Sequence, residues 1–138
     1  MKITVETIVN APIARVWKAW TDPADIVRWN FASPDWHCPS AHVDLRVGGV
    51  YGSRMEAKDG SFGFDFGATI SALEPEALLQ YDIGDGRKVD VRFVQTAAGV
   101  QVTESFDAED ENSAEMQRQG WQAILDNFRK HVEAGQAA

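Results

Sequence analysis

Alternating apolar and polar residues mark the first segment of the chain. Ile3, Val5 and Val9 fall on one side of residues 2–9, and Lys2 and Glu6 fall on the other. A period of two residues is typical of a strand with one buried face. We therefore predict an opening strand that ends before the proline at position 12.

Two short helices are predicted after this strand. From Ile13 to Trp20 the apolar residues recur at spacings of three, one and three, which places them on one helical stripe. Asp22 is a suitable N-cap for a second helix, and Pro23 suits its first position. The two helices form a bent bracket that meets at Asp22.

Residues 30 to about 41 carry Pro34 and Pro39 among aromatic residues, which favours an irregular loop that acts as a lid. Carboxylate, imidazole and thiol groups near this loop could bind zinc, and a cysteine with a histidine could act as nucleophile and base. Their spacing matches no familiar zinc pattern, and no third member of a catalytic triad is evident. We therefore predict no metal and no cofactor. The residues concerned are Asp35, His37, Cys38, His42 and Asp44.

Period-two alternation dominates the middle of the chain. Residues 43–47 and 51–57 flank Gly48-Gly49 and read as a hairpin, and a turn at Asp59-Gly60 leads to a strand over 62–72. Glycines at positions 63 and 67 permit a bend or a bulge in that strand. A curved sheet follows from this pattern.

Three more turns divide the remaining strands. They lie at Glu74-Pro75, Asp85-Gly86 and Ala98-Gly99, and they separate strands over residues 78–83, 88–96 and 100–107. The chain then has about seven strands, joined mostly as hairpins. Hairpin connections make the sheet mostly antiparallel.

The last segment reads as a long amphipathic helix. Asn112 is its predicted N-cap and Glu115 completes a capping box, and the helix runs to about Glu133. Gly120 in its interior costs about 1 kcal/mol relative to alanine, which indicates close approach of another element or room for a ligand. The apolar stripe consists of Trp121, Ile124, Leu125, Phe128 and Val132.

In this order of elements the chain resembles the START-like or SRPBCC superfamily, and within it the branch similar to the C-terminal domain of the activator of the heat-shock chaperone ATPase. The resemblance implies an α+β helix-grip fold, with a curved antiparallel sheet of six to seven strands and a long C-terminal helix across its concave face. The length of the chain separately predicts a single domain, over residues 1–135, and small residues mark a tail over 136–138. The residues that carry the resemblance are Ala11-Pro12, Val16-Trp17, Thr21-Asp22-Pro23, Ile26, Trp29, Asp44-Leu45-Arg46-Val47-Gly48-Gly49, Gly120-Trp121, Leu125 and Phe128.

Aromatic residues indicate a hollow interior. Four of the five tryptophans fall between Trp17 and Trp36, more large rings than one short stretch needs to close a core. Together with the helix-grip resemblance, they predict a cavity between the sheet and the C-terminal helix that binds a small lipophilic molecule, such as a lipid-, sterol- or polyketide/flavonoid-like one. The predicted lining residues are Trp17, Trp20, Trp29, Met55, Phe62, Phe64, Phe66, Tyr81, Phe93, Glu104, Trp121 and Phe128.

Glu104 is unusual because it shares a strand face with Val100, Val102 and Phe106. A carboxylate on a buried face is costly unless it is paired or protonated. A bulge could turn it to solvent, or a salt bridge to Arg54 or Arg92 could neutralise it. Otherwise it orients a ligand or acts as a base.

Composition excludes several classes of function. The chain of 138 residues has a net charge of −8, so nucleic acid and anionic lipid surfaces are repelled. No apolar run reaches the roughly 20 residues that span a membrane. We expect a cytoplasmic protein, and the single cysteine fits a reducing compartment.

Three functions stay open at this stage. The first, which we favour, is a carrier or sensor that holds a small hydrophobic ligand without turnover. The second is an enzyme of the aromatic-cyclase or hydrolase kind that uses a polar cavity residue such as Glu104, His37 or Tyr81. The third is a chaperone-associated interaction module with a protein partner, which the family name implies.

Overall fold

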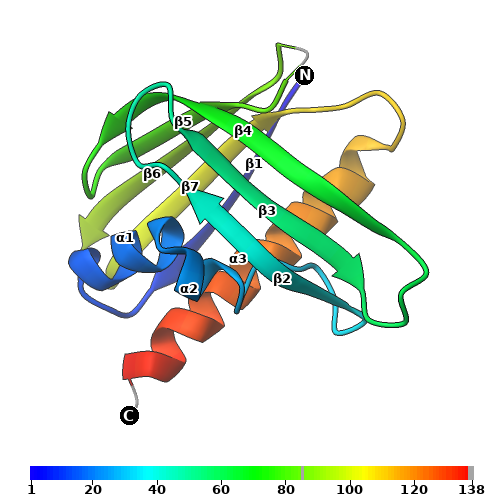
Figure 1. Ribbon diagram of the computed structural model, residues 1–138. Helices are drawn as coiled ribbons and strands as arrows, with labels where there is room; N and C mark the ends of the chain where they lie inside the picture. The colour runs from blue at the N-terminus through cyan, green and yellow to red at the C-terminus, as the bar shows by residue number, and fades with distance from the viewer. Residues whose placement is uncertain (85, 137–138) are drawn as a thin grey trace.

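The computed structural model describes residues 1–84 and 86–136, folded as a curled sheet that wraps around one long helix (Figure 1). The turn predicted at Asp85-Gly86 includes a residue outside this range. In chain order the elements are β1 (Lys2–Val9), α1 (Ile13–Thr21), α2 (Pro23–Ile26), β2 (Trp36–Val43), β3 (Val50–Ala57), β4 (Gly63–Glu74), β5 (Leu78–Asp82), β6 (Lys88–Thr96), β7 (Gly99–Asp107) and α3 (Ala114–Gln136).

The sheet has seven strands in the order β1-β7-β6-β5-β4-β3-β2, and every neighbouring pair is antiparallel. Strand β1 therefore closes against the last strand, while the other strands follow one another as hairpins. α3 lies across the concave face and packs along β1, where the Gln122 side chain donates a hydrogen bond to the Glu6 carbonyl oxygen (Figure 1). The predicted α+β helix-grip architecture is confirmed.

The loop predicted over residues 30–41 is wrong in its second half, because residues from Trp36 onward form β2. This strand lies at the edge of the sheet, and its pairing with β3 shifts register between His37 and Ser40. Pro39 falls within that irregularity, where its missing N–H interrupts no regular ladder. The segment is thus a bulged edge strand and not a lid.

The hairpin predicted around Gly48-Gly49 exists, but its first strand ends earlier and its connection is longer than predicted. β2 ends at Val43, so Leu45 and Val47 belong to the connection and are exposed. A Cβ on Gly49 would overlap the Asp44 carbonyl oxygen, so this close approach requires glycine. In β4 the register shifts between Ile70 and Ala72, not at the two glycines where we predict a bend.

An ionic network joins the three helices at one end of the sheet. Asp25, on α2, is buried and accepts hydrogen bonds from Arg15 and Lys18 of α1. His131 of α3 lies 2.8 Å from the same carboxylate. Burial opposes ionisation, but these hydrogen bonds outweigh it and lower the pKa of Asp25. The short helices are thereby fixed to the end of α3.

Helix α3 begins one residue later than predicted. Ser113, not Asn112, is the cap, since its hydroxyl accepts a hydrogen bond from the Met116 N–H. The helix includes Gln136, the first residue of the predicted tail, and residues 137–138 lie outside the described range. Within residues 1–84 and 86–136, no helix is long and apolar enough to cross a membrane.

Candidate functional site

A cavity of about 210 Å³ lies between the concave face of the sheet and α3. The connection after α2 closes one side of it, and the first half of β4 closes another. The described residues that line it are Trp20, Trp29, Asn30, Tyr51, Met55, Phe64, Phe66, Tyr81, Glu104, Trp121 and Ile124.

Paired aromatic rings build the walls of the cavity. Tyr51 of β3 and Tyr81 of β5 stack across the intervening strand β4, with ring centroids 5.0 Å apart. On the opposite side, Trp121 of α3 stacks on Phe106 of β7 at 3.8 Å. Each of these lining rings is thus held in place by a stacked partner: Tyr51 and Tyr81 by each other, and Trp121 by Phe106 outside the cavity lining.

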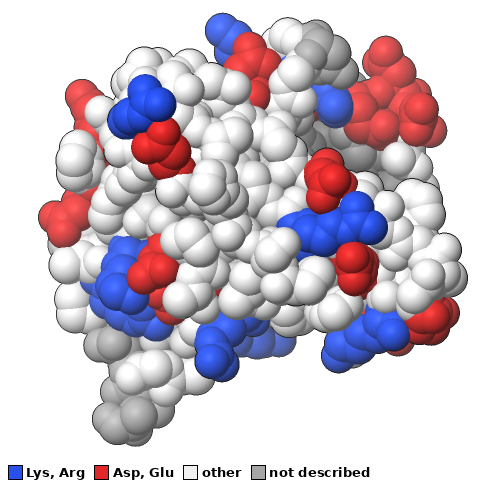
Figure 2. All heavy atoms as spheres, in the orientation of Figure 1, with Lys and Arg blue, Asp and Glu red and all other residues white. Residues whose placement is uncertain are grey.

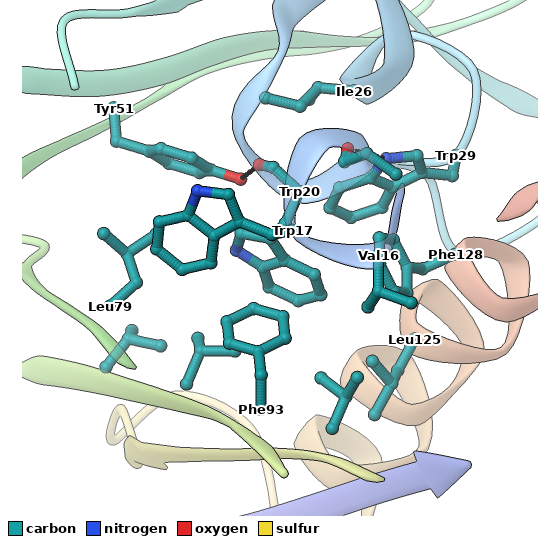
Figure 3. Packing of buried hydrophobic residues seen from close by; sticks show 14 of the residues in the cluster. Val16, Trp17, Trp20, Ile26, Trp29, Tyr51, Leu79, Phe93, Leu125 and Phe128 are labelled. Carbon is teal, nitrogen blue, oxygen red and sulfur yellow. Dashed lines mark hydrogen bonds between the residues drawn. The ribbon is translucent and has the colours of Figure 1, made fainter. Parts of the chain in front are cut away.

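Hydrogen bonds to α1 hold two of the lining rings in place. The Tyr51 hydroxyl donates to the Trp20 carbonyl oxygen, the bond drawn as a dashed line in Figure 3. The Trp29 indole N–H donates to the Ala19 carbonyl oxygen at 3.0 Å. The indole N–H of Trp20 itself is buried and has no hydrogen-bond partner among the described residues.

Among the described lining residues, Glu104 carries the single carboxyl group. It is only 5% exposed and makes no hydrogen bond or ion pair with a described residue. Burial raises its pKa to about 8, so it holds a proton at neutral pH. Burial, and to a lesser degree the nearby Glu104, also raises the pKa of Tyr51 and of Tyr81 well above 10.

Both structural explanations considered for Glu104 are wrong. β7 continues in regular register with β1 and β6 through this position, so no bulge turns the side chain to solvent. Arg54 pairs with Glu56 and Asp65. Arg92 pairs with Asp90. A carboxyl on an otherwise apolar strand face was the signal in the sequence, and the tertiary structure leaves it facing the cavity.

An outer groove of about 710 Å³ adjoins the cavity and shares Phe64 and Trp121 with it. It runs between the start of β4 and the first turns of α3. Gly120 faces this groove, and a Cβ at that position would meet nothing within 4 Å. Of the two explanations considered for Gly120, close approach of another element is therefore wrong, and the glycine instead faces open space.

The structure separates the twelve predicted site residues into three groups. Eight line the cavity, and their role as ligand contacts stays a prediction: Trp20, Trp29, Met55, Phe64, Phe66, Tyr81, Glu104 and Trp121. Trp17, Phe93 and Phe128 lie in the core instead, where Trp17 packs edge-on against Phe93 with centroids 5.3 Å apart (Figure 3). Phe62 is 62% exposed and lies in the outer groove, since it precedes the first residue of β4.

Sequence reasoning missed three lining residues. Tyr51 and Ile124 do lie on the predicted apolar faces of their strand and helix, so the pattern alone could have found them. Asn30 carries no such signal. It lines the cavity because its amide donates a hydrogen bond to the Ser53 hydroxyl of β3.

The histidine and cysteine group does not assemble into a site. Cys38 is buried and its thiol donates to the Ser40 carbonyl oxygen. Burial raises the pKa of that thiol. His37 lies 3.7 Å from Glu56 on the neighbouring strand. The described residues contain no group of three or more metal-ligating side chains.

Comparisons with solved structures agree with this architecture. The AHSA1-like protein from Aeromonas hydrophila is 47% identical, with a TM-score of 0.93 over all of this chain and 96% of that one. Chr148 from Cytophaga hutchinsonii is also 47% identical, with a TM-score of 0.83 over 99% of this chain and 94% of that one. CV1439 from Chromobacterium violaceum shares the fold at 23% identity, with a TM-score of 0.84 over 96% and 98% of the two chains.

A comparison with curated proteins gives no significant match. A family model, however, matches residues 10–133, from the end of β1 to near the end of α3. The matched segment includes both short helices, six strands and most of the long helix that covers the cavity. The chain therefore belongs to the Activator of Hsp90 ATPase homolog 1-like protein family, within the START-like or SRPBCC superfamily.

Proposed function

We propose that this protein binds a small, ring-containing lipophilic molecule in the cavity under α3. The observation that carries the proposal is an unfilled space of about 210 Å³ whose wall consists mainly of aromatic rings. Concave, mostly apolar pockets with a few polar groups are the usual form of small-molecule sites. Family membership supports the proposal at a coarser level, because the superfamily is known for ligand binding.

The volume restricts the size of the ligand. An apolar cavity of roughly 150 Å³ is enough to hold benzene, whereas pockets for drug-sized ligands span about 300–1,000 Å³. The cavity here, at about 210 Å³, lies between these limits. Of the lipophilic classes predicted from the sequence, the proposal therefore favours a one- or two-ring head group. A longer tail would leave along the outer groove past Phe64 and Trp121.

Titration with indole and naphthalene tests the proposal, with amide and tryptophan indole NMR shifts as the readout. We expect saturable shifts at cavity residues such as Trp20, Tyr81 and Trp121. The variant Ile124→Phe adds a ring inside the cavity and should weaken binding at least tenfold. Val94→Phe adds the same ring on the exposed outer face of β6 and should leave binding unchanged.

Two results would overturn the proposal. One is the absence of saturable shifts with either probe. The other is equal binding by Ile124→Phe and the unmodified protein, which would place the probes outside the cavity.

Glu104 favours a second candidate, an enzyme that performs acid–base chemistry on the bound molecule. A carboxyl group with a pKa of about 8 can donate or accept a proton near neutral pH. It lies in the cavity wall, within reach of a bound ligand. Chemical change of a bound probe in the unmodified protein, and none with Glu104→Gln, would favour this candidate over a carrier.

A further inference from the structure

Two side-chain groups of the cavity wall have no partner among the described residues: the Trp20 indole N–H and the Glu104 carboxyl group. Glu104 lies opposite Val5 of β1 and Val91 of β6, so its strand neighbours on both sides are aliphatic. The carboxyl group has no described partner and is nearly fully buried. Buried polar groups almost always have a partner, and leaving one unpaired is costly. A bound molecule is therefore the natural source of the missing partner.

The surrounding wall determines the charge of that molecule. None of the described lining residues is basic, so an anionic ligand would meet the carboxyl group without any compensating charge. Tyr51 and Tyr81 face the same space, and their raised pKa keeps both hydroxyls protonated. Glu104 is thus the one group in the wall that can supply a negative charge near neutral pH.

Aromatic faces complete a setting suited to a cation. A positive group over the face of a tryptophan, tyrosine or phenylalanine ring is attracted by the ring quadrupole, and the attraction increases when water is excluded. The cavity offers such rings from four elements: Trp20 from α1, Tyr51 from β3, Tyr81 from β5 and Trp121 from α3. One carboxyl group among several rings is a chemical match for an organic ammonium ion.

The outer groove that adjoins the cavity is also mainly acidic, like Glu104. The outer groove is lined by Asp107, Glu109 and Glu111, with Arg87 as the single basic residue among its described lining. Acidic side chains gather at the upper right of Figure 2, over the segment between β7 and α3. A net charge of −8 adds to this local field. Such fields raise the local concentration of cations and their rate of association.

We propose that the ligand is a small aromatic amine whose ammonium group pairs with the Glu104 carboxylate. This inference rests on the proposed function and specifies the ligand class. The ring would occupy the space between Phe66, Tyr81 and Trp121, and the amine would point toward β7. The cavity volume limits the molecule to about one or two rings with a short aminoalkyl chain.

Proton linkage gives the proposal a distinctive signature. Glu104 has a pKa of about 8 in the empty protein. Binding of R–NH₃⁺ therefore converts the carboxylic acid to a carboxylate and releases one proton to solvent. Affinity for the amine should increase about tenfold from pH 6 to pH 7 and about fivefold more by pH 8. A neutral ligand of the same shape should show no such dependence.

Three probes of nearly equal size test the charge preference: 2-phenylethylamine, 2-phenylethanol and 3-phenylpropanoate. Calorimetric titration of the intact chain at pH 6, 7 and 8, in two buffers with different ionisation heats, measures affinity and proton release together. We expect the amine to bind at least tenfold more tightly than the alcohol at pH 8, with the anion weakest. Proton release should approach one per amine bound at pH 7.

Glu104→Gln is the matched variant, because it keeps the side-chain shape and removes the titrating group. It should lower amine affinity at pH 8 at least tenfold and abolish the pH dependence, whereas the affinity for 2-phenylethanol should change far less. Retained amide NMR dispersion checks its fold, and Glu104→Leu offers a second substitution if that check fails. Equal binding of amine and alcohol, with no proton release, would overturn the amine assignment alone. Failure of all three probes to bind would instead overturn the proposed function.

Discussion

The Tyr51 hydroxyl lies 2.6 Å from the carbonyl oxygen of Trp20 and donates a hydrogen bond to it. The bond connects the start of β3 to the last turn of α1, and both residues line the cavity. A side chain that closes the cavity therefore also sets the position of the helix beside it.

Tyr51→Phe removes this bond and leaves the buried Trp20 carbonyl without its side-chain donor. We expect a loss of about 1–3 kcal/mol in the free energy of unfolding, measured by urea denaturation. Tyr81→Phe is the control, because it deletes a hydroxyl from the stacked partner ring without affecting the Trp20 carbonyl. Equal losses from the two variants would contradict the role assigned to the Tyr51 bond.

Asp25→Asn should destabilise the protein more strongly. It removes the charge that Arg15 and Lys18 surround, and leaves the half-buried Arg15 without its ion-pair partner. Breaking a buried ion pair costs about 3–5 kcal/mol. Water screens the exposed Lys18, so we expect a loss in the lower part of this range. Thermal or urea unfolding at pH 7 measures the effect. Asp22→Asn is the control, because it keeps a capping side chain and removes only the more exposed ion pair with Lys18.

The same carboxylate predicts an acid-dependent loss of stability. The pKa of Asp25 is lowered in the folded protein from its ordinary value of 3.8, so folding favours the charged form. Its stabilisation is complete above that ordinary value and is lost as the pH falls below it toward the folded-state pKa. Unfolding curves between about pH 5 and pH 2 should show a smaller acid dependence in Asp25→Asn than in the parent.

Glu104 predicts the opposite pH dependence. Its pKa is raised from 4.5 to about 8 on folding, so the folded state holds a proton that the unfolded state has lost between these values. Stability contributed by this residue is therefore fully present below pH 4.5 and decreases as the pH rises toward 8. The slope should be about 1.4 kcal/mol per pH unit at most. Glu104→Gln should flatten it, and an unchanged slope would show that Glu104 titrates normally.

Gly120→Ala should stabilise the protein. Alanine is favoured over glycine in a helix interior by about 1 kcal/mol, and nothing lies near the added methyl group. Gly49→Ala is a contrasting variant, since its methyl group would overlap the Asp44 carbonyl oxygen and the change should destabilise the fold. Urea denaturation of both variants distinguishes these outcomes, and a loss of stability in Gly120→Ala would indicate a hidden contact at the groove.

Local patterns predicted most of the elements because their causes are local. Period-two alternation located the strands from β4 to β7, and Asp22 with Pro23 marked the start of α2, where the Asp22 carboxylate accepts a hydrogen bond from the Ala24 N–H. The same reasoning failed at β2. Pro39 is typical of a loop when only its sequence neighbours are considered. The residues on both sides of it nevertheless pair with β3, on either side of the bulge.

The lining of the cavity depended on distances that no local pattern contains. Trp17 and Trp20 lie three residues apart on the same buried stripe of α1, yet Trp17 packs into the core and Trp20 lines the cavity. Which ring faces the space depends on how far the sheet curls and on where α3 crosses it. The curl of the sheet and the position of α3 both result from many long-range contacts, such as the stacking of Phe106 on Trp121.

The sequence by itself determined the order of the elements, the family, and the presence of an unusual carboxyl group on an apolar strand face at position 104. These features depend on residue spacing along the chain and not on contacts between distant segments. Only the tertiary structure decided that this group faces an unfilled space and has no partner among the described residues. The physical reason is that a cavity is a property of packing between distant segments, here β7, the β3–β4 hairpin and α3.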